Sequence, residues 1–136
     1  MRSAKVARAK EDGNSHFRKG EFADAVRLYT LSADLAATRP VCEANVYARD
    51  ELALALCNRS AAYASLGEHI NALVDADAVL QLKRNWPKGH FRKGKALAGA
   101  GRLDEARESY LLGLQFDPSN EVRETLAVSS SVRVCR

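Results

Sequence analysis

The chain has 136 residues, a length that suits a single domain with a continuous buried core. Hydrophobic residues make up 46% and charged residues 28%, an ordinary balance that argues against disorder over most of the length. The formal net charge of +4 favours acidic partners of any kind, nucleic acid and anionic lipid included. No apolar run approaches the roughly 18 residues of a membrane span. The charged N-terminal stretch also lacks the apolar core of a secretory signal, so we expect an intracellular, cytoplasmic chain.

Cysteine and histidine usage gives no sign of a metal centre or a catalytic site. The cysteines are odd in number and lack the paired spacing of a disulfide framework or a zinc site: Cys42, Cys57 and Cys135. The histidines have no metal-ligand spacing and no cysteine close by: His16, His69 and His90. A phosphate-binding glycine loop is also missing from the sequence. We therefore expect a protein that is not an enzyme, with no metal and no cofactor.

Taken in chain order, the periodicity predicts six helices, at roughly 4–19, 22–37, 45–66, 69–82, 87–100 and 103–116. A capping helix is expected from about 120, where Val122 and Leu126 stand four residues apart. These two side chains would cover the exposed face of the last pair of helices, as a stacked array requires. The chain is therefore predicted to be all-α.

A glycine followed five residues later by an alanine recurs three times along the chain. The pairs are Gly20 with Ala25, Gly67 with Ala72, and Gly101 with Ala106. Between the second and third pairs both marks shift by 34, the period of tetratricopeptide (TPR) helix–turn–helix units. Between the first and second both shift by 47, which exceeds 34 by 13 and indicates one insertion at about 40–52. The pattern predicts three repeats in one domain over 1–136, at about 6–39, 53–86 and 87–120.

The small residues of each repeat have a structural explanation. Each of the three glycines ends the first helix of its pair, where a left-handed turn costs least without a Cβ. Gly13, Ser60 and Gly94 recur on the first helices, where two helices must approach closely. Because a glycine inside a helix costs about 1 kcal/mol relative to alanine, its recurrence suggests a packing reason. The second repeat departs from the pattern, with Ala76 where the others have Tyr29 and Tyr110.

The inserted stretch at about 40–52 has Pro40 near its start, and proline can stop the preceding helix. From Glu43 onward it has no helix breaker before Leu52. We expect it to lengthen the first helix of the second repeat at its start by up to two or three turns. A spacer and a binding surface are equally good interpretations of this segment.

In the TPR fold the first helix of each pair lines a concave groove, and residues four apart share a helix face. Lys10 and Asn14 are four apart on the first such helix, and Lys88 and Arg92 are four apart on the third. Asn58 lies on the helix between them, at the repeat position of Arg92. Stacking the repeats should bring these five side chains into one basin.

This set of residue types suits the end of an acidic peptide. A terminal aspartate carries two carboxylates, which need several convergent donors, some charged and some neutral. Lysine and arginine supply charge, and asparagine supplies an NH₂ donor without repelling them. Capture of a terminal carboxylate is a known peptide-binding mode. Ala61 and Ala64 would leave room for a small apolar side chain before the terminus, whereas Phe91 could contact ligand but is better explained by core packing.

Three segments carry a family resemblance that covers about 6–126. KEDGN (10–14), CNRSAAYA (57–64) and WPKGHFRKGKAL (86–97) resemble the carboxylate-clamp TPR domains of chaperone cofactors. The resemblance implies a right-handed superhelical TPR solenoid that binds the acidic C-terminal tail of a heat-shock chaperone, with the 70-kDa class favoured and the 90-kDa class as the alternative. All five clamp positions carry over, as Lys10, Asn14, Asn58, Lys88 and Arg92.

A narrower resemblance lies in ARDELALALCNRSAAYA (48–64), VDADAVLQLKR (74–84) and GRLDEAR (101–107). These segments look like the cytosolic TPR subunit of the fungal post-translational ER translocation complex. That resemblance implies a role in receiving the 70-kDa chaperone and its client at the cytosolic face of the ER membrane. The membrane subunits of the complex would then be partners, without direct insertion of this chain into the bilayer.

Two other interpretations stay open. The first keeps the fold and makes the chain a general TPR scaffold for a different protein partner. The second is a basic helical domain that binds nucleic acid, which the net charge suggests. It is disfavoured because acids interleave with the bases, as where Asp104, Glu105 and Glu108 flank Arg102 and Arg107, and no nucleic-acid motif is present.

Overall fold

The computed structural model describes residues 2–38 and 46–117, and in these ranges it contains helices and no strand. The helices are α1 (Arg2–Arg18), α2 (Phe22–Ala37), α3 (Val46–Ser65), α4 (His69–Leu82), α5 (Pro87–Gly99) and α6 (Leu103–Phe116). Every bound lies within two residues of its sequence-based prediction. The predicted capping helix, with Val122 and Leu126, lies outside the described residues.

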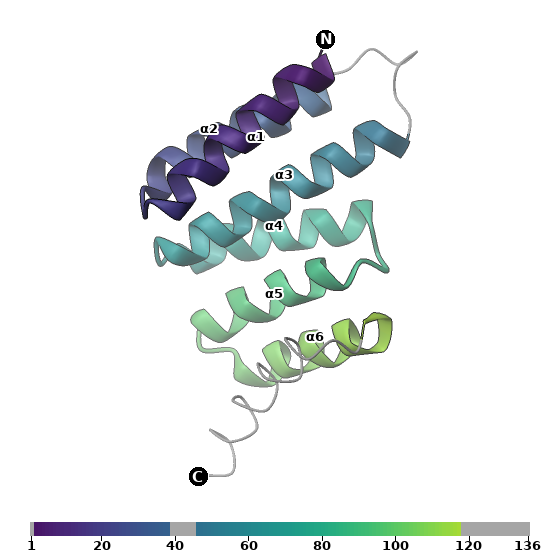
Figure 1. Cartoon of the computed structure of the whole chain (residues 1–136). Helices are drawn as coiled ribbons and strands as arrows, with labels where there is room; N and C mark the ends of the chain where they lie inside the picture. The colour runs from purple at the N-terminus through teal and green to yellow at the C-terminus, as the bar shows by residue number, and fades with distance from the viewer. Residues whose placement is uncertain (1, 39–45, 118–136) are drawn as a thin grey trace.

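The helices stack in antiparallel pairs, each packing against the next along the chain. In Figure 1, α1, α3 and α5 lie side by side in one layer, with α2 and α4 behind it. The helix α3 contacts both α1 and α5, so the first helices of the three pairs form a continuous surface. This all-α solenoid confirms the predicted fold class.

The three turns between paired helices have the same geometry. Gly20, Gly67 and Gly101 adopt φ values of +81°, +83° and +85°, the left-handed conformation that the sequence predicts. The amide of the residue after each glycine reaches back to the helix, as in the 2.9 Å bond from the Glu21 N–H to the His16 carbonyl. This bond closes a Schellman cap, which satisfies a free carbonyl at the helix end. Identical turns give the three pairs the same starting geometry.

Glycine makes room for a tyrosine ring in the first and third repeats. A Cβ built on Gly13 would lie 2.7 Å from the Tyr29 ring, and one built on Gly94 would lie 2.7 Å from the Tyr110 ring. Both rings are buried, with 2% and 3% of their surface exposed. The recurrence of glycine therefore has the packing reason that the sequence suggests, since each ring lies directly on the backbone of the first helix.

In the second repeat the small and the large residue of these two positions are both replaced by residues of intermediate or smaller size. Ser60 replaces the glycine and Ala76 replaces the tyrosine, and both are fully or almost fully buried. The Ser60 hydroxyl donates a 2.8 Å hydrogen bond to the Ala72 carbonyl on α4, so the buried polar group is satisfied. The departure noted in the sequence is therefore compensated within the pair.

A buried ion pair ties the first two repeats together. Arg59 on α3 donates two 2.7 Å hydrogen bonds to the Asp75 carboxylate on α4 and a 3.2 Å bond to the Thr30 hydroxyl on α2. The Asp75 side chain is only 5% exposed. The hydrogen bonds that Arg59 donates to Asp75 raise the pKa of Arg59 despite its partial burial, so the guanidinium stays charged. Three helices are thereby held by one side chain.

The predicted lengthening of the second repeat's first helix is confirmed for the described part of the insertion. One repeat period before Pro87, where α5 begins, is residue 53, and α3 begins seven residues earlier at Val46. This extension amounts to about two turns. Asp50, in the extension, forms a 3.1 Å ion pair with Lys83, whose ammonium also lies 5.0 Å from the centre of the Trp86 ring. The extra turns are thus fixed to the segment between α4 and α5.

The exchange between glycine–tyrosine and serine–alanine pairs can be tested in the third repeat. Gly94→Ser should destabilise the domain by about 1–3 kcal/mol, because the new side chain meets the Tyr110 ring. Tyr110→Ala should cost about 3–5 kcal/mol through the cavity it leaves. The double variant copies the second repeat, so urea unfolding should show a loss smaller than the sum of the two. Strictly additive losses would contradict this volume exchange.

The Arg59–Asp75 pair predicts a large effect from a single carboxylate. Asp75→Ala should lower the free energy of unfolding by about 3 kcal/mol, because it leaves a partly buried guanidinium without its partner. Asp77→Ala is the matched control on the same helix, since Asp77 pairs with Lys93 at 3.1 Å but is half exposed. The control should cost less than about 1 kcal/mol in the same denaturation assay. Equal losses of unfolding free energy in the two variants would show that the burial of Asp75 does not increase the contribution of its ion pair to stability.

Candidate functional site

The five residues predicted to form the basin lie on the three helices of the exposed layer. Lys10 and Asn14 are on α1, Asn58 is on α3, and Lys88 and Arg92 are on α5. Lys88 is exposed and the other four are half-buried. Because α3 contacts both α1 and α5, the three helices that carry these residues lie next to one another in one layer (Figure 1).

Four of these side chains have free hydrogen-bonding capacity. Within residues 2–38 and 46–117, Lys10, Asn58, Lys88 and Arg92 have no hydrogen-bond or ion-pair partner. The Nε atom of Arg92 is in addition buried, so its N–H group is shielded from water without an acceptor. A buried donor without an acceptor is costly, and a ligand that accepts from it removes that cost. His69 Nδ1 and Arg107 Nε share this condition elsewhere, so it supports a site only together with the other donors.

Asn14, the fifth member, is held by a residue that the sequence analysis did not assign to the site. The hydroxyl of Tyr29, on α2, donates a 2.6 Å hydrogen bond to the Oδ1 atom of Asn14. The pairing of Gly13 with Tyr29 in the repeat pattern could have placed the ring beside α1. The hydrogen bond to the next residue along α1 depends on the ring's exact depth, which the pattern does not give.

The electrostatics of Tyr29 link it to the third repeat. Burial raises the pKa of the Tyr29 phenol, the charges of Arg18 and Arg92 lower it, and Glu11 raises it. Arg92, from α5, therefore lies close enough to the phenol of α2 for its charge to act there. Glu11 occupies the first repeat's equivalent of Asn58 and Arg92, and it is exposed. The predicted basin would thus carry three cations and two amides, with the Glu11 carboxylate on the same helix as Lys10 and Asn14.

The residues expected to contact a peptide side chain fall into two kinds. Ala61 and Ala64 are half-buried on α3, within two turns of Asn58. The Phe91 ring packs edge-on against Tyr110, with ring centres 5.9 Å apart, and joins the cluster around Leu97. Core packing, the preferred interpretation of Phe91, is therefore what the structure shows.

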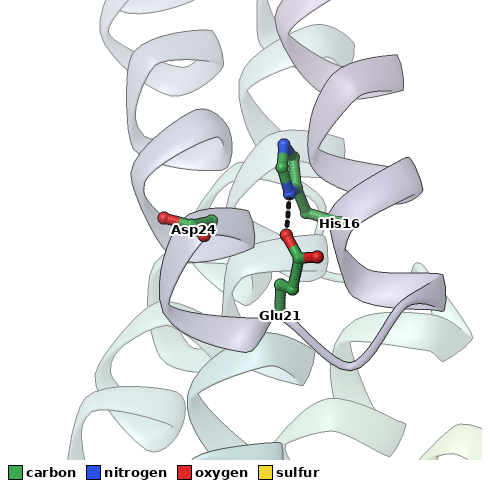
Figure 2. A group of neighbouring side chains, drawn as sticks. All are labelled: His16, Glu21 and Asp24. Atoms are coloured by element: carbon green, nitrogen blue, oxygen red, sulfur yellow. Dashed lines mark hydrogen bonds and ion pairs between the residues drawn. The ribbon is translucent and has the colours of Figure 1, made fainter.

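The turn between α1 and α2 gathers three potential metal ligands that the sequence spacing did not single out. The ring nitrogen Nδ1 of His16 lies 2.5 Å from Oε2 of Glu21, and ligand-type atoms of these residues and Asp24 lie within 4.8 Å of one another (Figure 2). Asp24 also pairs with Arg27 one turn along α2. Each of the three groups thus already has a polar partner, His16 and Glu21 in one another and Asp24 in Arg27.

A separate hollow of about 460 Å³ opens between the start of α3 and the segment joining α4 to α5. Its walls include Leu82, Trp86 and the ion pair of Lys83 with Asp50. Arg49, from the extension of α3, is exposed at its edge. The extra turns supplied by the insertion therefore form one wall of a recess outside the basin.

In the part of the chain that the structure describes, no helix combines the length and the apolar character that crossing a membrane requires.

Comparison with known proteins finds relatives of two kinds, a protein translocation subunit and proteins named for heat-shock chaperones. It is 36% identical over 112 residues to the ER protein translocation subcomplex subunit sec67 of Schizosaccharomyces pombe, covering 82% of this chain and 58% of that protein. It is also 36% identical over 114 residues to an Hsp70-Hsp90 organising protein of Plasmodium falciparum, covering 84% of this chain and 40% of the relative. The chain thus spans about half the length of these relatives. No family model matches it.

Among solved structures, the first TPR domain of Spaghetti (RPAP3), bound to the HSP90 peptide SRMEEVD, superposes with a TM-score of 0.79 at 26% identity. The match covers 97% of this chain and 95% of that one, so it extends over the whole solenoid. The 34-residue period, the glycine-centred turns and this superposition agree with the sequence relatives. The chain is a tetratricopeptide-repeat domain, homologous to sec67 and to the TPR domains of the Hsp70-Hsp90 organising proteins.

Proposed function

We propose that this domain is a non-catalytic adaptor that grips the acidic C-terminal tail of a heat-shock chaperone. The clamp consists of Lys10, Asn14, Asn58, Lys88 and Arg92. The observation that carries the proposal is their place on three adjacent helices of one layer, where four of the five have no polar partner in the described ranges. Such free donors are what a doubly charged peptide terminus requires.

The roles follow from the donor types. Lys10 and Lys88 supply ammonium groups, and Arg92 supplies a planar fork that can hold a carboxylate through two parallel hydrogen bonds. The buried N–H of Arg92 gains the acceptor that it lacks in the free domain. Asn14 and Asn58 add neutral donors, which orient the ligand without increasing repulsion among the cations.

The relatives support a chaperone tail as the ligand. The organising proteins are named for the Hsp70 and Hsp90 classes, and the peptide held by the RPAP3 domain ends in Glu-Glu-Val-Asp. A C-terminal aspartate places two carboxylates on one residue, which matches the clamp. Ala61 and Ala64 leave room for a side chain of the size of valine just before it. We favour the 70-kDa class, with the 90-kDa class as the alternative.

The similarity to sec67 supports a place for this recruitment. We propose that the domain acts in the cytoplasm at the cytosolic face of the ER membrane, where it delivers chaperone-bound clients to protein translocation. Its further partners there would be membrane subunits of a translocation complex. The domain itself is not proposed to enter the bilayer or to bind nucleic acid.

The clamp predicts that binding depends on the free C-terminal carboxylate. Calorimetry with SRMEEVD and its C-terminally amidated twin should give an affinity about 10-fold or more higher for the acid, because charge-assisted hydrogen bonds are worth about 1.5–3 kcal/mol. Affinity for the acid should also fall as salt is added, since exposed charges are screened. Equal affinity for the two peptides would refute the clamp.

The clamp further predicts which cations of α5 matter. Lys88→Ala and Arg92→Ala should each weaken binding of SRMEEVD about 10-fold or more, with helicity unchanged, because each removes a charged donor. Lys93→Ala is the matched control, since Lys93 lies on the same helix but is paired with Asp77 of α4. It should leave the affinity within about twofold, a limit set by long-range screening alone. A loss equal to that of Arg92→Ala would mean that net charge, rather than the clamp, drives binding.

A further inference from the structure

We propose that Tyr29 is a positioning residue for the clamp: its hydroxyl holds the side-chain amide of Asn14 with the NH₂ group turned toward the peptide carboxylate. This inference rests on the proposed function and assigns a part in it to a residue of the second helix, which does not line the groove.

The Tyr29 ring has little freedom to move. It is 2% exposed and packs with Ala25 and Ala62, which are fully buried. On its other side it lies against the α1 backbone at Gly13, so closely that a single added carbon would lie 2.7 Å from it. The residue after Gly13 is Asn14. Because the ring is held at this depth by packing, its hydroxyl lies at a fixed point beside the Asn14 side chain.

The direction of the hydrogen bond sets the orientation of the amide. The phenol has one proton to give, and Oδ1 of Asn14 accepts it at 2.6 Å. Were the amide flipped, its NH₂ would face the phenol oxygen and the phenol proton would lose this acceptor. Oδ1 would then face the groove, where it would oppose a carboxylate as acceptor against acceptor. The hydroxyl therefore selects the orientation in which Asn14 can donate to a peptide terminus.

The surroundings keep the phenol in its donating form. Burial raises the pKa of Tyr29, which keeps the hydroxyl protonated at neutral pH, although the charges of Arg18 and Arg92 partly oppose this and Glu11 adds to it. The 2.6 Å bond to Asn14 also joins the hydroxyl directly to a member of the clamp. An anion bound by Arg92 would then lie near the amide that Tyr29 orients.

The third repeat shows that the fold does not need this hydroxyl. Tyr110 packs against Gly94 as Tyr29 packs against Gly13, and it is equally buried. Within the described ranges the Tyr110 hydroxyl has no hydrogen-bond partner, and the position equivalent to Asn14 is Lys95. Its pKa is raised by burial, with no charged neighbour acting on it. The tyrosine ring is therefore needed for packing within the repeat, whereas the hydroxyl of Tyr29 orients Asn14.

The test compares Tyr29→Phe with Tyr110→Phe in the whole chain, at a temperature at which both variants are folded. Tyr29→Phe should weaken binding of the SRMEEVD acid about 3- to 10-fold, the range expected for one hydrogen bond. Tyr110→Phe, which removes the same atom from the equivalent ring, should leave the affinity unchanged. In an Asn14→Ala background, Tyr29→Phe should have no further effect on affinity.

A spectroscopic readout separates positioning from stability. The side-chain NH₂ resonances of Asn14, assigned by their loss in Asn14→Ala, should shift in Tyr29→Phe and stay in place in Tyr110→Phe. An unchanged affinity in Tyr29→Phe, or an equal loss with and without Asn14, would overturn the positioning role while leaving the clamp intact. If the unaltered chain binds acid and amide peptides equally, the clamp fails first and the role of Tyr29 falls with it.

Discussion

The close approach of the two helices in each pair is the constraint on which the rest of the structure depends. A tyrosine ring can lie on the backbone of the first helix only where that helix has a glycine, as at Gly13 and Gly94. Protein interiors tolerate neither overlap nor empty space of this size, so the two positions must change together. The second repeat obeys the same rule with Ser60 and Ala76. Three pairs of equal thickness can then stack with their first helices in one layer.

That layer determines which charges are free. Two cations of the first helices pair with a carboxylate of α4: Arg59 with Asp75, and Lys93 with Asp77. Arg92 precedes Lys93 by one residue and so points about 100° away from it around α5. There it has no partner in the described part of the chain. The three cations of the proposed clamp, Lys10, Lys88 and Arg92, are thus among the charges that have no ion-pair partner in the described ranges.

The same packing couples the fold to the proposed site. The glycine that admits the Tyr29 ring is the direct neighbour of Asn14, so the ring's depth and the amide's orientation share one cause. The second repeat has Ala76 at the position of the tyrosine, so it has no hydroxyl there that could orient a side chain of the first helix. The third repeat keeps the tyrosine but has Lys95 at the position of Asn14. In the described part of the chain, the first repeat therefore has a hydrogen bond between its tyrosine and its first helix that the second and third repeats lack.

The sequence by itself determined the period, the six helices and the left-handed turns at Gly20, Gly67 and Gly101. These depend on local properties, the 3.6-residue periodicity and the absence of a Cβ, and each is repeated three times in 136 residues. It also determined which face of each first helix carries the candidate clamp, since residues four apart share a face in any helix. The binding role of that face stays a prediction.

Only the tertiary structure decided the contacts between helices. The bond from Tyr29 to Asn14, the link from Arg59 to Thr30, and the grouping of His16 with Glu21 and Asp24 join residues whose spacing matches no motif. Each depends on the separation of helix axes and on side-chain rotamers, which are set by how all the neighbouring volumes pack together. A local pattern can place a residue on a face, but the depth of a ring between two helices is decided by both helices at once.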